Sequence, residues 1–174
     1  MAHAGDGERV AAALVDRLAG LTFVDKTADE VTALLIDAAA AWAAEQGWRV
    51  YRRAASVLPL PPPYAHQRST VDLACARPHG APIVIEFDRT NRQRSIDKLL
   101  AEAAAGRVAI WVRWNSRRIE PAPPPIWLVP CEVIARSGAG DRGRLFSRLP
   151  APDRPAPMHT VLEGAVDQQP DLFS

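Results

Sequence analysis

The sequence has no long hydrophobic run and almost no net charge. No apolar stretch reaches the roughly 20 residues that a membrane-spanning helix needs, and the N-terminal sequence MAHAGDGERV lacks the apolar segment of a secretory signal. We therefore expect a cytoplasmic protein with no membrane partner. The 174 residues contain 21 Lys and Arg against 20 Asp and Glu, so a surface that binds nucleic acid has to be local rather than global.

Cysteine and histidine are too scarce for a structural zinc site. Cys75 and Cys131 are the only cysteines, and the four histidines do not cluster with them. We expect both thiols to be free and buried in a reducing compartment. Hydrophobic residues form 48% of the chain and charged residues 24%, which is typical of a globular domain large enough to have its own core.

Three acidic residues lie close together in two segments that alternate between apolar and other residues. Asp72 lies in the segment 71–76, and Glu86 and Asp88 lie in the segment 83–88. Alternation with a period of two predicts a β-strand for each segment. The acids are therefore expected on two neighbouring strands.

The residues between these strands predict how the acids face each other. Residues 77–80, Arg-Pro-His-Gly, indicate a tight turn with glycine in the left-handed conformation. With a loop at 78–80, Asp72 faces Glu86 directly, and Asp88 projects from the same face as Glu86. Three crowded carboxylates repel each other and call for a cation, and oxygen ligands suit Mg²⁺ or Mn²⁺.

An acid on one strand, acid-x-acid on the next strand, and then a helix and a strand resemble the PD-(D/E)XK nuclease superfamily. The residues that carry the resemblance are Asp72 and Glu86-Phe87-Asp88, within a region from about 27 to 114. Val71 stands where the family often has proline, and Asp88 stands where it usually has lysine. The resemblance implies an α/β, restriction-endonuclease-like core of helix, three strands, helix and strand, with a mixed central sheet.

The hydrophobic pattern of the whole chain agrees with this order. We divide the chain into an N-terminal helical extension packed outside the core (1–26), a nuclease-like domain (27–149) and a proline-rich flexible tail (150–174). Within the domain we expect a core helix that begins at Thr27, a helix capped by Ser95, and a flexible segment at 137–141. Further strands are expected at 48–58, ending before Pro59, at 108–112, and at 126–134.

Two residues have both a functional and a structural interpretation. The resemblance implies a metal ligand at Glu30 on the first core helix, but Thr27 and Glu30 also form a capping box, which we favour. Lys98 could replace the missing strand lysine and stabilise negative charge that develops during reaction. A helical wheel, however, points Lys98 away from Ile96 and Leu99, which favours a solvated lysine.

The resemblance implies a metal-dependent nuclease that hydrolyses phosphodiester bonds in DNA. Asp72, Glu86 and Asp88 would be its metal ligands and catalytic residues, with Lys98 beside them and Asp88 acting alternatively as a base. The structural alternative to a metal site is a solvent-facing strand edge, which explains one acid easily but three converging acids poorly. Two other functions stay open: a catalytically inactive module that binds DNA or protein, and an RNA-directed or toxin-type nuclease.

Arginines surround the acids in the sequence. They can neutralise nucleic-acid phosphates, although ordinary solubilising charge is the alternative. The candidates are Arg68, Arg89, Arg92, Arg94 and Arg113, with Arg117, Arg118 and the loop residue His66 nearby. No recognition helix that would read bases is evident.

The C-terminal sequence resembles the peptide with which bacterial proteins bind the DNA polymerase sliding clamp. A glutamine is followed by a short gap and a Leu-Phe pair, in Gln169-Pro170-Asp171-Leu172-Phe173. The prolines between 150 and 157 predict an extended linker before it. The resemblance implies that Gln169, Asp171, Leu172 and Phe173 contact the clamp during replication or repair; a chance match of five residues is the alternative.

Overall fold

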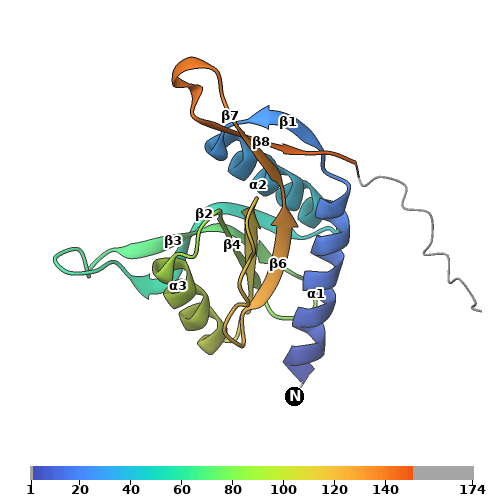
Figure 1. Ribbon diagram of the computed structural model, residues 1–174. Helices are drawn as coiled ribbons and strands as arrows, with labels where there is room; N and C mark the ends of the chain where they lie inside the picture. Colours follow the sequence, from blue (N-terminus) through green and yellow to red (C-terminus); the bar gives the residue numbers. More distant parts are fainter. Residues whose placement is uncertain (1, 151–174) are drawn as a thin grey trace, which may run out of the picture.

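A five-stranded mixed sheet carries the acidic segments in this computed structural model, which describes residues 2–150, with side chains from residue 5 onward (Figure 1). The strand order is β2-β3-β4-β5-β6; β2 to β4 pair antiparallel, and β4 to β6 pair parallel. The strands are β2 Arg49–Pro59, β3 Arg68–Ala76, β4 Ile83–Asp88, β5 Val108–Asn115 and β6 Trp127–Glu132. The expected α/β class with a mixed central sheet is confirmed. The sliding-clamp-like segment lies outside the described residues.

The register between β3 and β4 is the one that the turn predicts. Leu73 pairs with Ile85, and Cys75 pairs with Ile83, so the same register puts Asp72 opposite Glu86. Gly80 has a φ of 103°, which only glycine adopts readily. The turn is closed by Arg77, whose Nε donates to the carbonyl oxygen of Ala81 at 2.7 Å.

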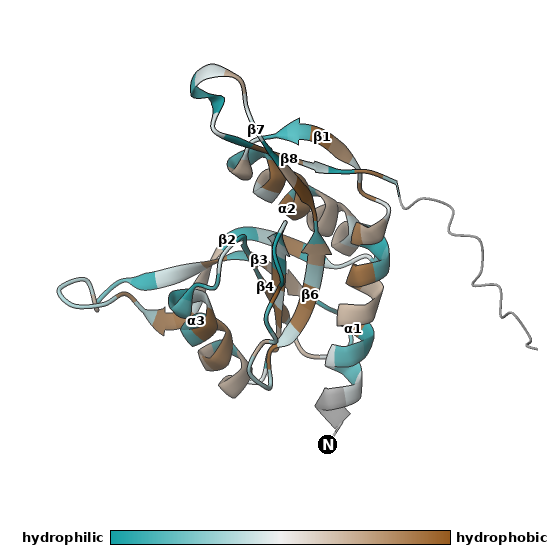
Figure 2. Cartoon of the chain, viewed as in Figure 1, coloured by the Kyte–Doolittle hydropathy of each residue, from teal (hydrophilic) through white to brown (hydrophobic). Residues whose placement is uncertain are grey.

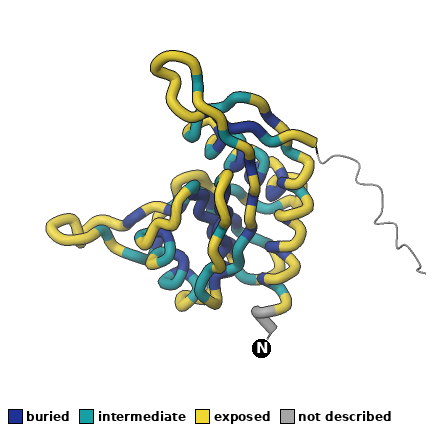
Figure 3. The backbone as a smooth tube through the Cα atoms, viewed as in Figure 1, coloured by how far each residue is buried: buried dark blue, intermediate teal, exposed yellow. Residues whose placement is uncertain are grey.

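Three helices cover the two faces of this sheet. The helices are α1 Ala2–Ala19, α2 Ala28–Glu45 and α3 Gln93–Ala104. The larger apolar cluster joins α1 and α2 to one face, and a smaller cluster around Leu99 and Trp111 joins α3 to the other. Every residue of β4 is buried (Figure 3), as expected for a strand covered on both sides. Apolar residues accordingly concentrate on the strands and on the inner helix faces (Figure 2).

Helix α1 belongs to the core rather than to its outside, contrary to the expectation from sequence. Leu14 and Leu18 are fully buried, in the same cluster as the central strands, because the apolar stripe of α1 packs on β5, β6 and α2. An ion pair between Asp6 and the nearly buried Arg77 ties the start of the helix to the β3–β4 turn.

The two predicted caps have different outcomes. The capping box of α2 is confirmed: the Thr27 amide donates to Glu30 at 2.8 Å, and the Glu30 amide donates to the Thr27 hydroxyl at 3.3 Å. Ser95 is not a cap. Helix α3 begins at Gln93, with Arg92 at its N-cap, so Ser95 lies inside the first turn and its hydroxyl faces Glu86 instead.

A second, antiparallel sheet was not expected from the sequence. Its order is β1-β8-β7, from strands β1 Phe23–Lys26, β7 Ile134–Ser137 and β8 Arg144–Arg148. The predicted strand 126–134 is therefore divided between β6 and β7. The segment 137–141, expected to be flexible, begins with the last residue of β7 and runs into the short 3-10 helix Gly140–Arg142 before β8. The sheet lies beside α2 (Figure 1), and Phe146 packs edge-on against Trp114 at 5.0 Å between ring centroids. None of the described helices is long and apolar enough to cross a membrane.

Candidate active site

A cavity of about 620 Å³ opens where β3 and β4 meet the first turns of α2 and α3. Asp72, Glu86 and Asp88 all line it, together with Lys98, as the sequence predicts for the acids. The remaining lining includes four more charged residues and several small or apolar ones: Asp29, Arg53, Arg89 and Arg92, with Ala28, Thr32, Ala33, Ile36, Thr70, Phe87, Thr90 and Trp114.

Glu86 is the most perturbed acid of the cavity. Only 3% of the residue is exposed, and burial raises the pKa of its carboxyl to about 7, with the negative charge of Asp72 adding to the rise. Lys98 opposes that rise, since its Nζ donates to Glu86 Oε1 at 2.8 Å. The hydroxyl of Ser95 lies 3.4 Å from the other carboxylate oxygen. Glu86 is thus a buried carboxyl that can change protonation near neutral pH.

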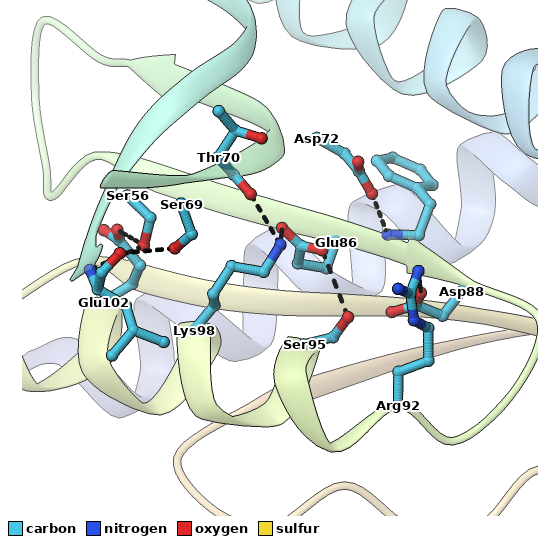
Figure 4. A network of polar contacts seen from close by, with 12 residues as sticks. Ser56, Ser69, Thr70, Asp72, Glu86, Asp88, Arg92, Ser95, Lys98 and Glu102 are labelled. Atoms are coloured by element: carbon cyan, nitrogen blue, oxygen red, sulfur yellow. Dashed lines mark hydrogen bonds and ion pairs between the residues drawn. The ribbon is translucent and has the colours of Figure 1, made fainter. Parts of the chain in front are cut away.

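Asp72 links the middle of β3 to the end of β4. Its Oδ2 accepts the backbone N–H of Phe87 at 2.9 Å, as Figure 4 shows. Burial raises the pKa of Asp72, and this hydrogen bond partly offsets the rise. The carboxylate is therefore fixed beside Glu86, across the register described above.

Asp88 accepts one hydrogen bond and has one long ion pair. Trp111 Nε1 donates to Oδ2 at 2.8 Å, and Arg92 Nη1 lies 3.6 Å from Oδ1. Only 5% of Asp88 is exposed. Asp88 is thus a buried acid with two partners of its own.

Lys98 points into the site, not into solvent. Its ammonium donates to the Thr70 carbonyl oxygen at 2.7 Å as well as to Glu86, and its side chain is 12% exposed (Figure 4). The solvated position that the helical wheel favours is wrong, because α3 has a second inward face. Ser95 and Glu102, three residues before and four residues after Lys98, are buried on that polar face.

The acids do not already form a multi-ligand metal cage. Among the described side chains, residues 5–150, no group of three or more His, Cys, Asp and Glu residues is arranged to hold an ion. Glu30 does not line the cavity, and its hydrogen bond to the Thr27 amide lowers its pKa as a capping carboxylate. Asp72 and Glu86 are left as the two carboxylates whose mutual repulsion a cation would relieve; Mg²⁺ often needs only one or two, since it keeps several waters.

The candidate arginines separate into three groups. Arg89 and Arg92 line the cavity. Arg68 and Arg94 donate to the carbonyl oxygens of Val57 at 2.5 Å and Pro59 at 2.7 Å, which holds the projecting β2–β3 hairpin.

Arg113 is not available to a nucleic acid. It is 4% exposed, its guanidinium stacks over Trp111 at 4.8 Å, and burial lowers its pKa. Arg113 is buried because of its position on β5. The clustering of arginines in the sequence does not show which of them are buried.

Two cavity residues escaped the sequence analysis. Thr70 contributes a carbonyl oxygen to Lys98, and Arg53 lines the cavity from the edge strand β2. A backbone carbonyl has no sequence signal, and the adjacent residues Arg52 and Arg53 look alike in the sequence, so nothing there shows which of them lines the cavity.

Comparisons with known proteins identify no relative of this chain. No family model matches it, and no curated protein or solved structure matches it significantly. The cavity is therefore the feature of this chain that points to a function.

Proposed function

We propose that this protein is a metal-dependent nuclease that hydrolyses phosphodiester bonds in DNA, built on a restriction-endonuclease-like fold. The observation that carries the proposal is the buried pair of Glu86 and Lys98, 2.8 Å apart, in a cavity that Asp72 and Asp88 also line. A buried ion pair contributes little to stability. A cavity that holds such a pair and two further acids is therefore better explained by a function than by a need of the fold.

Asp72 and Glu86 would hold Mg²⁺ or Mn²⁺, which when bound stabilises charge on a phosphate and lowers the pKa of a bound water. The chain's own residues prepare the rest of the site. The ammonium of Lys98, which donates to Glu86 and to the Thr70 carbonyl oxygen, would neutralise a phosphate oxygen at the same place. Arg89 and Arg92 supply positive charge at the cavity wall for the neighbouring phosphates.

A catalytically inactive nuclease-fold module that binds DNA or protein is the second candidate. The observation that favours it is Asp88, whose carboxylate accepts the Trp111 indole N–H and lies 3.6 Å from the Arg92 guanidinium. An acid that is held in this way orders the end of β4 without taking part in chemistry. An RNA-directed nuclease would use the same acids, so RNA belongs among the substrates that are tested.

The test is incubation of the purified protein with single-stranded, duplex, flapped and mismatched DNA and with RNA, in Mg²⁺, Mn²⁺ or chelator. We expect cleavage that Asp72→Asn and Glu86→Gln abolish. Glu30→Gln is the matched control, since it changes an acid outside the cavity. Calorimetric titration with Mn²⁺ should show binding to wild type and Glu30→Gln but not to Asp72→Asn. Absence of cleavage on every substrate would favour the binding module.

We further propose that the sliding clamp of DNA polymerase recruits the protein through Gln169, Asp171, Leu172 and Phe173. The support is the sequence pattern, in which two apolar residues would occupy pockets of the clamp. A labelled peptide of residues 166–174 should bind purified clamp with a Kd of roughly micromolar order. The same peptide with Leu172→Ala and Phe173→Ala is the control, and equal binding of both peptides would reject recruitment.

A further inference from the structure

Arg53 stands directly across the β2–β3 ladder from Asp72. Arg52 pairs with Leu73, and Ala54 pairs with Val71, so the register assigns Arg53 to Asp72. The pair itself is not formed in the ladder, since Arg53 has a φ of 52°. This left-handed conformation is unfavourable for a residue with a Cβ and is uncommon outside glycine, asparagine and aspartate.

In the described part of the chain, one further non-glycine residue has a positive φ, and its contacts explain that conformation. Asp25 also has a φ of 52°, but its carboxylate receives two hydrogen bonds of 2.7 Å from Arg136. Its backbone N–H donates to the Ser147 hydroxyl at 2.9 Å. By contrast, Arg53 has no side-chain hydrogen bond or ion pair with any residue in the described part of the chain.

The other cations at the cavity have contacts within the protein. Lys98 pairs with Glu86, Arg92 approaches Asp88, and the guanidinium of Arg89 lies 5.8 Å from the ring centre of Phe146. Arg52, the neighbour of Arg53, pairs with Asp37 at 2.7 Å. Within residues 5–150, Arg53 therefore differs from the other cavity-lining cations in having no hydrogen bond, ion pair or aromatic contact of its side chain within the protein, so its charge is available to a ligand without loss of such a contact.

We propose that Arg53 binds a phosphate of the nucleic acid that enters the acidic cavity. The inference rests on the proposed function, which brings a phosphodiester to Asp72 and Glu86. A guanidinium presents a planar fork of donors that matches two phosphate oxygens. Strained backbone conformations cluster at ligand-binding sites, and Arg53 combines such a conformation with a place in the cavity lining.

The test is the binding of a fluorescent single-stranded DNA oligonucleotide, measured by anisotropy in chelator so that cleavage plays no part. Arg53→Gln should weaken binding about 10- to 100-fold, as expected for the loss of a charged hydrogen-bond pair. It should also reduce the slope of log K against log salt by about 0.7, which corresponds to one phosphate on a single strand. Arg53→Lys should keep the slope and lose part of the affinity, because it retains charge but not the fork.

Arg52→Gln is the matched control, since it removes the same charge one residue away, from a side chain that does not line the cavity. Its binding should stay within about twofold of wild type, the range of ordinary surface changes. Arg53→Gly tests folding: glycine adopts the observed φ without strain, so its melting temperature should equal or exceed that of wild type while binding is lost.

The outcomes separate this inference from the proposed function. If wild type binds and cleaves DNA and Arg53→Gln changes binding no more than Arg52→Gln does, the role of Arg53 is wrong and the nuclease stands. If binding depends on Arg53 but nothing is cleaved, the role of Arg53 is supported and the nuclease fails. If wild type binds no DNA in chelator or in Mg²⁺, both proposals are rejected.

Discussion

Lys98 Nζ lies 2.8 Å from Glu86 Oε1, and both side chains are nearly buried. The pair joins the middle of α3 to the end of β4, and the Thr70 carbonyl oxygen adds a second acceptor for the same ammonium at 2.7 Å. A buried pair of this kind contributes little net stability, but loss of one partner leaves an uncompensated charge. The site is therefore sensitive to pH and to single substitutions in ways that unfolding experiments can detect.

Glu86 should make the metal-free protein less stable as the pH rises. The folded-state pKa of about 7 lies above the ordinary value of 4.5, so between these pH values the folded state binds more protons than the unfolded state. We expect the free energy of unfolding to fall by up to about 3 kcal/mol between pH 4.5 and 7 and then to level off. Asp72, with its raised pKa, acts in the same direction.

Urea unfolding in chelator at a series of pH values measures this dependence. Glu86→Gln should flatten the fall, because the amide does not titrate. Glu30→Gln should leave it in place. An unchanged pH dependence in Glu86→Gln would show that another group is responsible for it.

The coupling between Lys98 and Glu86 can be measured by a double-mutant cycle. Lys98→Met leaves the Glu86 carboxyl buried without its cation, and we expect a cost of about 3 kcal/mol at pH 8. The cost should be smaller at pH 5, where Glu86 is protonated. In the Glu86→Gln background the same substitution should cost less, which gives a coupling energy of about 1–3 kcal/mol. Additive effects at both pH values would place Lys98 in solvent after all.

Local signals in the sequence were sufficient for the hairpin of the acids and for the cap of α2. The turn glycine fixes the register that brings Asp72 opposite Glu86, and Thr27 and Glu30 are three residues apart. Both features depend on residues that are close in the sequence, so a local sequence pattern is enough to predict them.

Features that depend on residues far apart in the sequence could not be predicted from local patterns. Phe23 pairs with Arg148 from the other end of the described chain, and no short pattern records such a partner. A helical wheel of α3 identifies the apolar face of the helix. It does not identify the second buried face, which is polar and carries Lys98. The left-handed conformation of Arg53 has no signal in its residue type.

Glu102 should be the main anchor of the β2–β3 hairpin on α3. Its Oε1 accepts the Ser56 hydroxyl at 2.8 Å and the Val57 amide at 2.7 Å, while Arg107 Nε lies 3.2 Å from Oε2. Glu102→Ala leaves these buried donors without an acceptor, which should cost about 2–4 kcal/mol. Glu102→Gln keeps an acceptor oxygen and should cost less. Chemical denaturation gives both values, and amide exchange at Val57 should accelerate in Glu102→Ala; equal costs would reject the anchor.

Substitutions of Asp88 distinguish between the two proposed functions, a nuclease and a catalytically inactive binding module. Asp88→Asn keeps an oxygen for the Trp111 indole N–H, so we expect a folded protein that still binds DNA. If Asp88 takes part in chemistry, cleavage falls in this variant while binding persists. If wild type cleaves nothing, Asp88→Lys would introduce the lysine that is usual in the PD-(D/E)XK superfamily, which the sequence resembles, and cleavage by this variant would support the resemblance.

Asp88→Lys, however, meets a physical obstacle that has to be measured beside activity. The position is 5% exposed, the Trp111 N–H loses its acceptor, and Arg92 and Arg113 already place positive charge around it. An unpaired buried charge should cost about 3–5 kcal/mol, far more than Asp88→Asn. Thermal unfolding of both variants tests this difference. A lysine variant as stable as Asp88→Asn would show that the site accommodates the superfamily's usual residue, and its failure to cleave DNA would then favour the binding module.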